Sequence, residues 1–573
     1  MKVSDLIVEI LVKNEVKHIF GYIGGFNADI IDSICKDKRI KIVLNYNEQA
    51  SGFAANGYAF LKNSFSVAIA SGAPSACNLI GGIADAFFDS LPCIFIIGSP
   101  NSRGSMHSNK IRQNLFEEIN YIDIVKKITK YAVKILDKNS IKFEFEKSFY
   151  LANHGRKGPV VIDIPYDISR AEVDASKLIG YKIRYANYRK YNYIARIKKI
   201  FENSKRPLII LGGGMRSAKC RDELIKFLQN HKIPCVCSLM GLDVLPHDHE
   251  CYIGFIGHYG NRYANLALYN ADVLLVLGSR LDERQLGGFS TEFRSNTKII
   301  RVDIDKCELR RRYKETISVN DYTENFLEKI NKAKLRFCDY FKWRSVILKW
   351  IKRYPSIDYK DNQLLANNII SCLSKHFKSD SIICADVGQN QMSVAQTVFL
   401  RSRERFITSG GYGSMGFSLP ASIGCAYVTN KNKTIISISG DGGLQMNIQE
   451  LETIIRDSLP IFVVVLNNKC LGMIRKTQEK FFDSRFFVSV EGYAVPSFEK
   501  IARSYQFEYI KISSLNEVDK VVHFMSENKF GIIEVELPTL QKNLPEPGKT
   551  INNQVPYLSN EEINNLNKEC MNV

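Results

Sequence analysis

Short apolar runs alternate with longer helical patterns along most of the chain. The runs are short, and most of them end in or next to Gly, Asp or Asn; examples are KIVLNYN, SVAIASG, CIFIIGS, PVVIDIP, PLIILGGG, DVLLVLGS, KIIRVDID, IICADVG, TIISISG and IFVVVLNN. Nearly continuous apolar strands of this kind are typical of parallel sheets that are covered by helices on both faces. The pattern therefore predicts an α/β fold with three doubly wound parallel-sheet domains.

Two connecting zones divide the chain. The first, around residues 170–200, is polar and rich in Tyr, Arg and Lys; the second, about 322–360, is helical and charged and contains Trp343 and Trp350. We therefore expect domains at 1–170, 185–335 and 360–545, followed by an extended, Asn- and Glu-rich tail at 546–573. The first residues carry apolar side chains at helical spacing, Leu6, Ile7, Ile10 and Leu11, which predicts an amphipathic opening helix rather than a secretory signal.

Composition narrows the class of protein. With 573 residues, 45% of them apolar and 24% charged, the chain is globular and long enough for several cores. No apolar run approaches the roughly 20 residues of a membrane helix, so we expect no membrane partner. The 14 cysteines have no metal-ligand spacing, which favours reduced, buried thiols in a cytoplasmic protein.

The net charge of +18 raises the question of nucleic acid. The lysines are spread along the chain, and no basic block carries stacking aromatic residues. We therefore expect no nucleic-acid partner. The excess of positive charge is compatible with an acidic small substrate and a diphosphate ligand.

The stretch SISGDGGLQMNIQELETIIRDSLPIFVVVLNNKCLGM places polar residues at the ends of two strands. Asp441 follows the first strand within Gly-Asp-Gly-Gly, and Asn468 ends the second, one helical crossover later. Ligands of such folds bind outside the carboxyl ends of the strands. Both side chains offer oxygen, the ligand that Mg²⁺ prefers, and the glycines let main-chain amides approach a diphosphate.

This pair resembles the Mg²⁺–thiamine diphosphate motif, and the chain resembles the acetolactate (acetohydroxyacid) synthase family over nearly its whole length. The resemblance implies a pyrimidine-binding first domain, a middle domain of the FAD-binding type and a diphosphate-binding third domain. It implies that Mg²⁺ is held by Asp441, Asn468 and the main-chain carbonyl of Cys470. The glycines that line the diphosphate are then Gly440, Gly442 and Gly443.

Further stretches carry the resemblance to the cofactor site. In NYNEQASGFAANGYA, Glu48 matches the catalytic glutamate, which hydrogen-bonds the aminopyrimidine ring and so promotes removal of the thiazolium proton. Met415 matches the residue that supports the bent cofactor and counts among the catalytic candidates. ADVGQNQMSVAQ and TSGGYGSMGFSLPASIG match the other flank, and the remaining thiamine-site candidates are Gly388, Gln389, Asn390, Met392, Gly413 and Met473.

The middle part resembles the family's FAD-binding domain, in which the flavin is largely structural. Its motifs are LGGGMRS, CSLMGLD, GHYGNRYAN, LGSRLDERQLGG and VDIDKCEL. The implied FAD residues are Arg156, Gly212, Gly213, Gly214, Ser238, Leu239, Met240, Gly278, Arg280, Asp282, Arg284, Asp303, Ile304 and Asp321.

The chain departs from the family at the expected substrate pocket. Glu117, the third catalytic candidate, stands where the family's Phe-Gln-Glu has its glutamine, after Phe116 of the substrate pocket. A carboxylate there changes charge and hydrogen bonding. The loop 99–115 is about six residues longer than is typical, Thr477 replaces a Trp, and His258 and Tyr259 replace a Met-His pair. Drift under relaxed demand is one explanation; a different or larger acceptor is the other.

The resemblance implies a carboligase that decarboxylates pyruvate and transfers the two-carbon unit to a second carbonyl. The acceptor is either a bulkier ketone, such as a nucleotide-linked keto-sugar, or a second pyruvate, as in acetolactate synthase itself. A pyruvate decarboxylase, a flavin-dependent pyruvate oxidase and a non-catalytic binding subunit are the rivals. The active unit is expected to be a homodimer or homotetramer with sites at the subunit interface.

Overall fold

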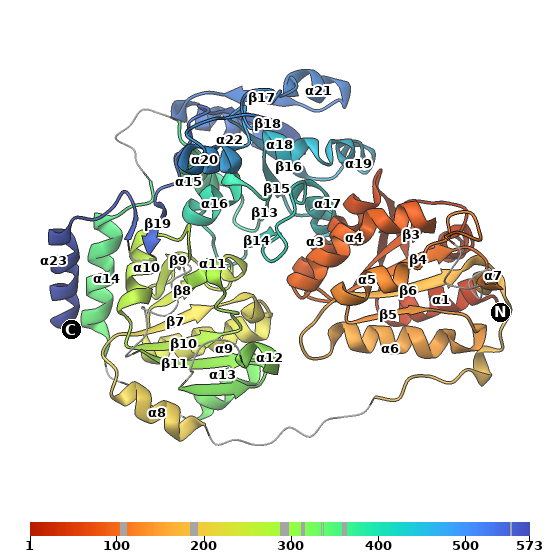
Figure 1. The fold of residues 1–573 in the computed structure, drawn as a ribbon, viewed down its shortest axis with the longest axis horizontal. Helices are drawn as coiled ribbons and strands as arrows, with labels where there is room; N and C mark the ends of the chain where they lie inside the picture. The colour runs from red at the N-terminus through yellow and green to blue at the C-terminus, as the bar shows by residue number, and fades with distance from the viewer. Residues whose placement is uncertain are drawn as a thin grey trace.

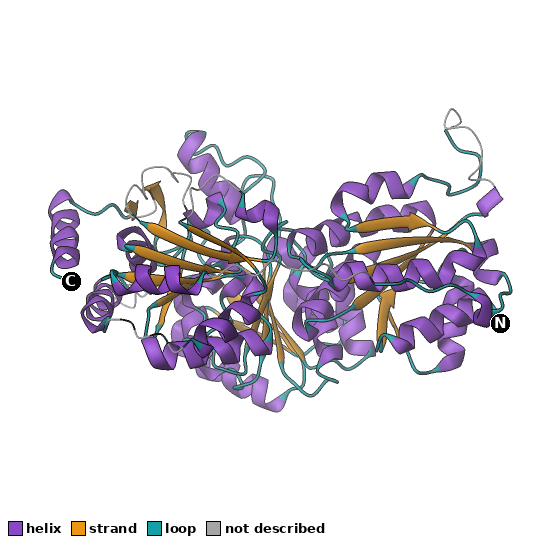
Figure 2. Ribbon diagram, turned by 90° about the horizontal axis from the view of Figure 1, so that it is seen from below, coloured by secondary structure: helices purple, strands orange, loops and turns teal. Residues whose placement is uncertain are grey.

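The computed structural model of the protein describes residues 1–573 apart from 104–111, 184–192, 287–296, 311–315, 334, 336, 338, 358–363 and 551–552. Within the described ranges lie three six-stranded sheets whose paired strands are all parallel. Helices cover both faces of each sheet (Figure 1, Figure 2). The predicted α/β fold with three doubly wound domains is confirmed. No helix in the described part of the chain combines the length and the apolar character needed to cross a membrane.

The first sheet has the strand order β2-β1-β3-β4-β6-β5. Its strands are β1 (His18–Gly21), β2 (Lys41–Leu44), β3 (Ser66–Ser71), β4 (Cys93–Ser99), β5 (Tyr131–Lys134) and β6 (Val160–Pro165). Its helices are α1 (Val3–Lys13), α2 (Ala28–Asp37), α3 (Glu48–Lys62), α4 (Gly72–Phe88), α5 (Tyr121–Val125), α6 (Ile141–Asn153) and α7 (Tyr166–Arg170). Strands β3, β4 and β6 are buried along their whole length, which explains their continuous apolar runs. Helix α1 is the predicted amphipathic opening helix and buries its apolar face.

The middle sheet has the order β12-β11-β10-β7-β8-β9. Its strands are β7 (Pro207–Leu211), β8 (Cys235–Cys237), β9 (Tyr252–Phe255), β10 (Val273–Leu277), β11 (Lys298–Asp303) and β12 (Ile317–Asn320). Its helices are α8 (Ile194–Glu202), α9 (Ala218–His231), α10 (Arg262–Asn270), α11 (Glu283–Leu286), α12 (Lys306–Leu309), α13 (Thr323–Lys332) and α14 (Phe341–Arg353). Trp343 and Trp350 of α14 are fully buried and pack edge to face, with their ring centres 5.6 Å apart.

The third sheet has the order β14-β13-β15-β16-β18-β17. Its strands are β13 (Ile382–Ala385), β14 (Arg405–Thr408), β15 (Ile435–Gly440), β16 (Ile461–Asn467), β17 (Tyr509–Ile512) and β18 (Gly531–Glu536). Its helices are α15 (Ala366–His376), α16 (Gln389–Thr397), α17 (Ser418–Val428), α18 (Asp441–Gln445), α19 (Leu451–Arg456), α20 (Gly472–Phe481), α21 (Phe498–Ser504) and α22 (Val518–Glu527). Helices α3 and α17 pack against each other and join the first and third domains (Figure 1).

The prediction of an extended tail at 546–573 is wrong. The segment forms a hairpin of β19 (Glu546–Thr550) and β20 (Asn553–Val555), followed by helix α23 (Asn560–Met571). Helix α23 lies beside α14 (Figure 1), where Leu566 is buried and Glu569 accepts a hydrogen bond from the indole N–H of Trp350 at 2.6 Å. A capping box of Ser559 and Glu562 starts the helix, because each side chain satisfies an amide that the helix end leaves free.

Every cysteine in the described part of the chain is a free thiol. Most are buried, as expected, but Cys35, Cys77 and Cys307 are exposed.

Candidate functional site

A cavity of about 270 Å³ opens at the carboxyl ends of β13, β15 and β16. We call it the third-domain cavity. It brings together twelve of the predicted thiamine-site and metal residues: Gly388, Gln389, Asn390, Gly413, Met415, Gly440, Asp441, Gly442, Gly443, Asn468, Cys470 and Met473. They come from four separate stretches of the chain, so only the sheet topology makes them one site.

Asp441 and Asn468 lie side by side because β15 and β16 are parallel neighbours in register up to the pair Gly440 and Leu466. Asp441 is 2% exposed, and burial raises the pKa of its carboxyl. One carboxylate oxygen accepts the main-chain N–H of Lys469 at 2.7 Å, and the other accepts the phenol of Tyr493 at 2.8 Å. Tyr493 belongs to no motif that sequence reasoning could have used.

The oxygen donors of this cavity suit a hard cation. In the described part of the chain no group of three His, Cys, Asp or Glu side chains is arranged to hold a metal. A cation here would therefore depend on the carboxylate of Asp441, the amide oxygen of Asn468 and a main-chain carbonyl such as that of Cys470. Mg²⁺ accepts such a partial set because water and ligand phosphates complete its coordination.

The glycine turn after β15 leaves no room for side chains. A methyl group at Gly442 would lie 2.8 Å from the Tyr493 hydroxyl oxygen, and one at Gly443 would lie 3.1 Å from the carboxyl carbon of Asp386. The turn therefore presents bare main chain to the cavity. This arrangement fits a diphosphate, whose oxygens bind backbone N–H groups.

The first turns of α4 bring together the two acidic candidates of the first domain. Glu48 begins α3, and its carboxylate accepts hydrogen bonds from Ser75 at 2.7 Å and Asn78 at 3.0 Å, both on α4. The carboxylate of Glu117 lies against Gly72, the first residue of the same helix. Neither glutamate is among the residues that line the third-domain cavity.

Three further predicted residues lie outside that cavity. Phe116 is 80% exposed. Thr477 is exposed, and its hydroxyl donates to the carbonyl oxygen of Met473 at 3.1 Å. Met392 is buried and faces another, narrower cavity. Residues 104–111 of the lengthened loop lie outside the described residues.

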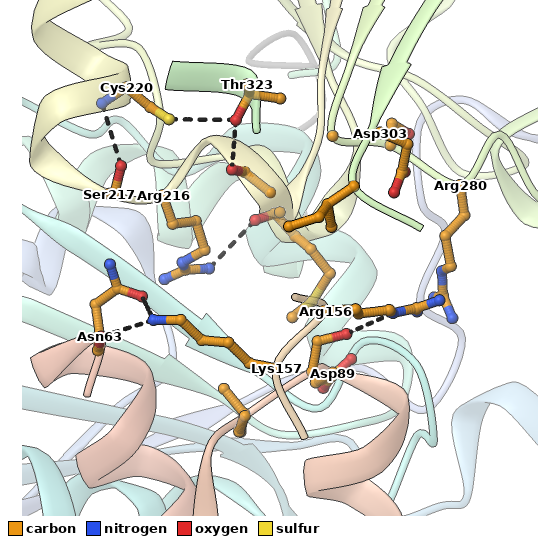
Figure 3. A pocket seen from close by; sticks show the side chains of 18 of the residues that line it. Asn63, Asp89, Arg156, Lys157, Arg216, Ser217, Cys220, Arg280, Asp303 and Thr323 are labelled. Carbon is orange, nitrogen blue, oxygen red and sulfur yellow. Dashed lines mark hydrogen bonds between the residues drawn. The ribbon is translucent and has the colours of Figure 1, made fainter. Parts of the chain in front are cut away.

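A second cavity, of about 360 Å³, lies between the first and middle domains (Figure 3). We call it the interdomain cavity. Nine of the predicted FAD residues line it: Arg156, Gly213, Gly214, Ser238, Met240, Gly278, Arg280, Asp303 and Ile304. It shares Ser238, Met240, Arg280 and Gln285 with a narrower space of about 50 Å³. That narrow space is lined by the predicted Leu239, Asp282 and Arg284, and also by His258, Tyr259 and Met392.

Two predicted FAD residues line neither space. Gly212 packs its main chain against Gly278. Asp321 precedes α13, and its carboxylate accepts hydrogen bonds from Lys329 at 2.5 Å and Asn325 at 3.1 Å of that helix. The sequence motifs could not distinguish residues that line the cavity from residues, such as these two, that support the turns beside it.

Three guanidinium groups line the interdomain cavity, and each is paired with a carboxylate. Arg156 donates to Asp305 at 3.1 Å and Glu308 at 2.8 Å, Arg280 lies 3.5 Å from Asp282, and the guanidinium of Arg216 lies 3.6 Å from the centre of the Phe60 ring. Burial raises the pKa of Asp303, at the end of β11, to about 6. Glycine turns, cationic groups and an acid at a strand end fit an anionic dinucleotide.

Sequence reasoning missed one wall of this cavity. Figure 3 shows Asn63, Asp89 and Lys157 of the first domain facing Ser217, Cys220 and Thr323 of the middle domain. These residues lie in segments far apart in sequence. Ser217 ends the LGGGMRS motif but was not among the predicted FAD residues, and the other five lie outside the quoted motifs.

Comparison with known proteins agrees with this architecture. Residues 1–124 match the family description "Thiamine pyrophosphate enzyme, N-terminal TPP binding domain", 194–330 match its "central domain", and 386–535 match its "C-terminal TPP binding domain". The chain is 32% identical to the acetolactate synthase large subunit of Buchnera aphidicola subsp. Schizaphis graminum, over 93% of this chain and 94% of that protein. It is 31% identical to the acetolactate synthase large subunit of Lactococcus lactis, over 95% and 93% of the two chains, and 33% identical to the chloroplastic acetolactate synthase of Arabidopsis thaliana, over 84% and 72%.

Proposed function

Because the chain belongs to the acetolactate synthase-like thiamine pyrophosphate enzymes, we propose that it is a thiamine diphosphate-dependent carboligase with pyruvate as donor. The observation that carries the proposal is the pairing of Asp441 and Asn468 at adjacent strand ends, beside a turn of bare main chain. A buried carboxylate and an amide oxygen at that place would hold Mg²⁺ together with the diphosphate of the cofactor.

Each part of the reaction has candidate residues in this chain. Thiamine diphosphate supplies, when bound, the nucleophilic carbon to which pyruvate adds before it loses CO₂. Asp441, Asn468 and the Cys470 carbonyl hold Mg²⁺, and Met415 supports the cofactor. Glu48 holds a proton against the aminopyrimidine ring, and its hydrogen bonds to Ser75 and Asn78 fix the direction of its carboxyl group.

FAD is the proposed occupant of the interdomain cavity. The cavity offers the glycine turns at Gly213 and Gly278 for a pyrophosphate and the carboxyl of Asp303 for a ribose hydroxyl. In this proposal the flavin is structural. Rapid bleaching of bound flavin by pyruvate alone would instead indicate a pyruvate oxidase.

The active unit is proposed to be a homodimer or homotetramer in which two chains share each site. Glu48 is absent from the lining of the third-domain cavity, so a second copy is the natural source of the glutamate. Helix α20 and the loop after it expose apolar side chains, among them Phe481 at 66%, Phe487 at 58% and Val488 at 75%. Apolar groups gathered on a surface beside a site mark an interface.

Mixing two inactive variants tests the shared site. If Glu48 and Asp441 act across the interface, randomly mixed chains of Glu48→Gln and Asp441→Ala recover about a quarter of wild-type activity, because half the dimers carry one intact site. No recovery after dissociation and reassociation would show that both residues act within one chain. Wild-type chains taken through the same mixing procedure are the control.

The acceptor is proposed to be a bulkier ketone without a carboxylate near its carbonyl group, such as a keto-sugar carried on a nucleotide. Glu117 puts a carboxylate at the first turn of α4, the helix that also positions Glu48. A second pyruvate would bring its own carboxylate toward that charge. Thr477, in place of a bulky indole, leaves volume on α20.

A cytoplasmic location of the protein stays a prediction.

Product analysis decides between this acceptor and acetolactate formation, which is the main alternative. Purified protein with thiamine diphosphate, Mg²⁺, FAD and pyruvate is assayed by mass spectrometry, with and without a panel of ketones. We expect slow acetolactate formation and faster formation of a mixed adduct. Rapid acetolactate formation that no ketone diminishes, and that Thr477→Trp does not change, would overturn the acceptor proposal. Acetaldehyde as the main product would identify a decarboxylase.

A further inference from the structure

The C-terminal end of α4 lies between the two cavities and contacts the loop that joins them. We call residues 409–416, between β14 and α17, the connecting loop. It carries Gly413 and Met415 of the third-domain cavity, and its Gly410 lines the narrow end of the interdomain cavity. Two acidic residues of the first domain, Asp85 and Asp89, hold this loop from one side.

Asp89 binds two consecutive amides of the connecting loop. Its carboxylate oxygens accept the N–H of Gly410 at 2.9 Å and of Gly411 at 2.7 Å. The same side chain lines the interdomain cavity, where Figure 3 shows it beside Arg156. One carboxylate therefore contacts both the space for a dinucleotide and the loop of the thiamine site.

Asp85, one helical turn earlier, fixes the rest of the loop. It is fully buried, accepts the amide N–H of Asn56 at 2.9 Å and accepts the hydroxyl of Ser409. The Ser409 oxygen in turn accepts the N–H of Gly413 at 2.9 Å and of Ser414 at 3.1 Å. These two amides use both acceptor positions of the hydroxyl, so the serine proton is directed to Asp85. The position of Gly413 thus depends on α4.

A second contact joins the cavity wall to the same loop. Met240 lines both the interdomain cavity and its narrow end, and a methyl group placed at Gly410 would strike its sulfur. Packing this close transmits displacement, because a dense interior does not absorb it. Burial raises the pKa of Asp89 to about 6, because a carboxyl group that is shielded from water is harder to ionise.

We propose that Asp89 is a positioning residue that couples the occupant of the interdomain cavity to the thiamine site. An anionic dinucleotide that contacts this wall orders Asp89, Asp89 orders Gly410 and Gly411, and the connecting loop then presents Gly413 and Met415 to thiamine diphosphate. The inference rests on the proposed function, since it takes FAD and thiamine diphosphate as the two ligands. Binding of each ligand then strengthens binding of the other by the same factor.

Two titrations measure this factor without any turnover. Calorimetry gives the affinity of thiamine diphosphate with Mg²⁺ in the absence and presence of saturating FAD, and flavin fluorescence gives the affinity of FAD with and without thiamine diphosphate. For the wild type we expect a factor on the order of 10 from both directions. In Asp89→Asn, which keeps the size but can accept only one of the two amides, the factor should fall close to 1. Asp123→Asn, an exposed carboxylate of the same domain, is the matched control and should keep the wild-type factor.

A second variant covers the case in which Asp89→Asn does not fold. Ser409→Ala removes the acceptor of Gly413 and Ser414, and Ser409 lines neither cavity. It should lower the factor at least threefold while FAD alone still binds as in the wild type. A wild-type factor of 1 with both ligands bound, or a factor unchanged in the variants, would overturn the coupling and leave the proposed function intact. Failure of FAD to bind wild-type protein would overturn the flavin assignment, and this inference with it.

Discussion

Replacing Glu117 by Gln tests the acceptor proposal at a single functional group. The carboxylate of Glu117 lies against Gly72 at the first turn of α4, and Ser75 of the same helix binds Glu48. Glutamine has nearly the same shape and restores the neutral amide that the related synthases place there. The change therefore removes one negative charge and little else.

The expected size follows from Coulomb's law. Two carboxylates about 4 Å apart repel by about 1 kcal/mol at the dielectric constant of water and by about 4 kcal/mol at an effective value near 20. Glu117 is half-buried, so its surroundings lie between these limits. Glu117→Gln should therefore raise kcat/KM for pyruvate as acceptor by about 5-fold at least, with an upper bound near 10³-fold. For an uncharged acceptor the change should stay within about 2-fold.

The assay compares acetolactate formation with addition to an uncharged ketone such as dihydroxyacetone, at fixed donor concentration. The matched control is Glu118→Gln, which removes the same charge one residue away; its carboxylate is engaged by the amides of Asn114 and Leu115 at 3.1 and 3.0 Å. Equal changes for both acceptors, or a loss of acetolactate formation, would refute the reasoning. A similar gain in the control would assign the effect to net charge rather than to position.

Three other predictions concern the cofactor site and stability. Glu48→Gln should lower turnover on the order of 10²-fold or more while calorimetry still detects thiamine diphosphate binding, because the amide keeps the hydrogen bonds but cannot hold the proton; unchanged pyruvate consumption would contradict the role. Asp441→Ala should abolish tight thiamine diphosphate binding, and excess Mg²⁺ should rescue it only in part, because the anionic ligand is lost; unaltered affinity by calorimetry would exclude the metal role. Burial alone would raise the pKa of Asp243, but the charges of Arg216 and Arg405 beside it lower that pKa from 3.8 to about 2. Since the folded pKa lies below the unfolded one, the stabilisation is present above about pH 4 and is lost as the pH falls toward 2; it amounts to on the order of 2 kcal/mol. Asp243→Asn should therefore lower the Tm clearly at pH 7 and by roughly half as much at pH 3, and equal losses at both values would argue against an ionised Asp243.

Much of the fold can be read from local pattern. Strands buried on both faces require continuous apolar runs, and the runs around β3, β4 and β16 therefore predict parallel sheets between helices. Parallel topology then places strand ends at one edge, which was enough to bring Asp441 beside Asn468. The tail was misjudged because its Asn- and Glu-rich composition outweighed the capping signal at Ser559, and because the partner of α23 lies two hundred residues away.

The sequence by itself determined the three sheets and the residues at their strand ends, because periodicity and turn chemistry act over a few neighbouring residues. Only the tertiary structure decided which of those residues share a cavity. It placed the carboxylate of Asp321 against α13 and Tyr493 on Asp441, and it set Glu117 at the head of α4. It also joined Asp89 to Gly410 across more than three hundred residues. Such contacts depend on how α3, α4 and α17 pack, and the packing of distant segments is set by the shape of the whole core rather than by local spacing.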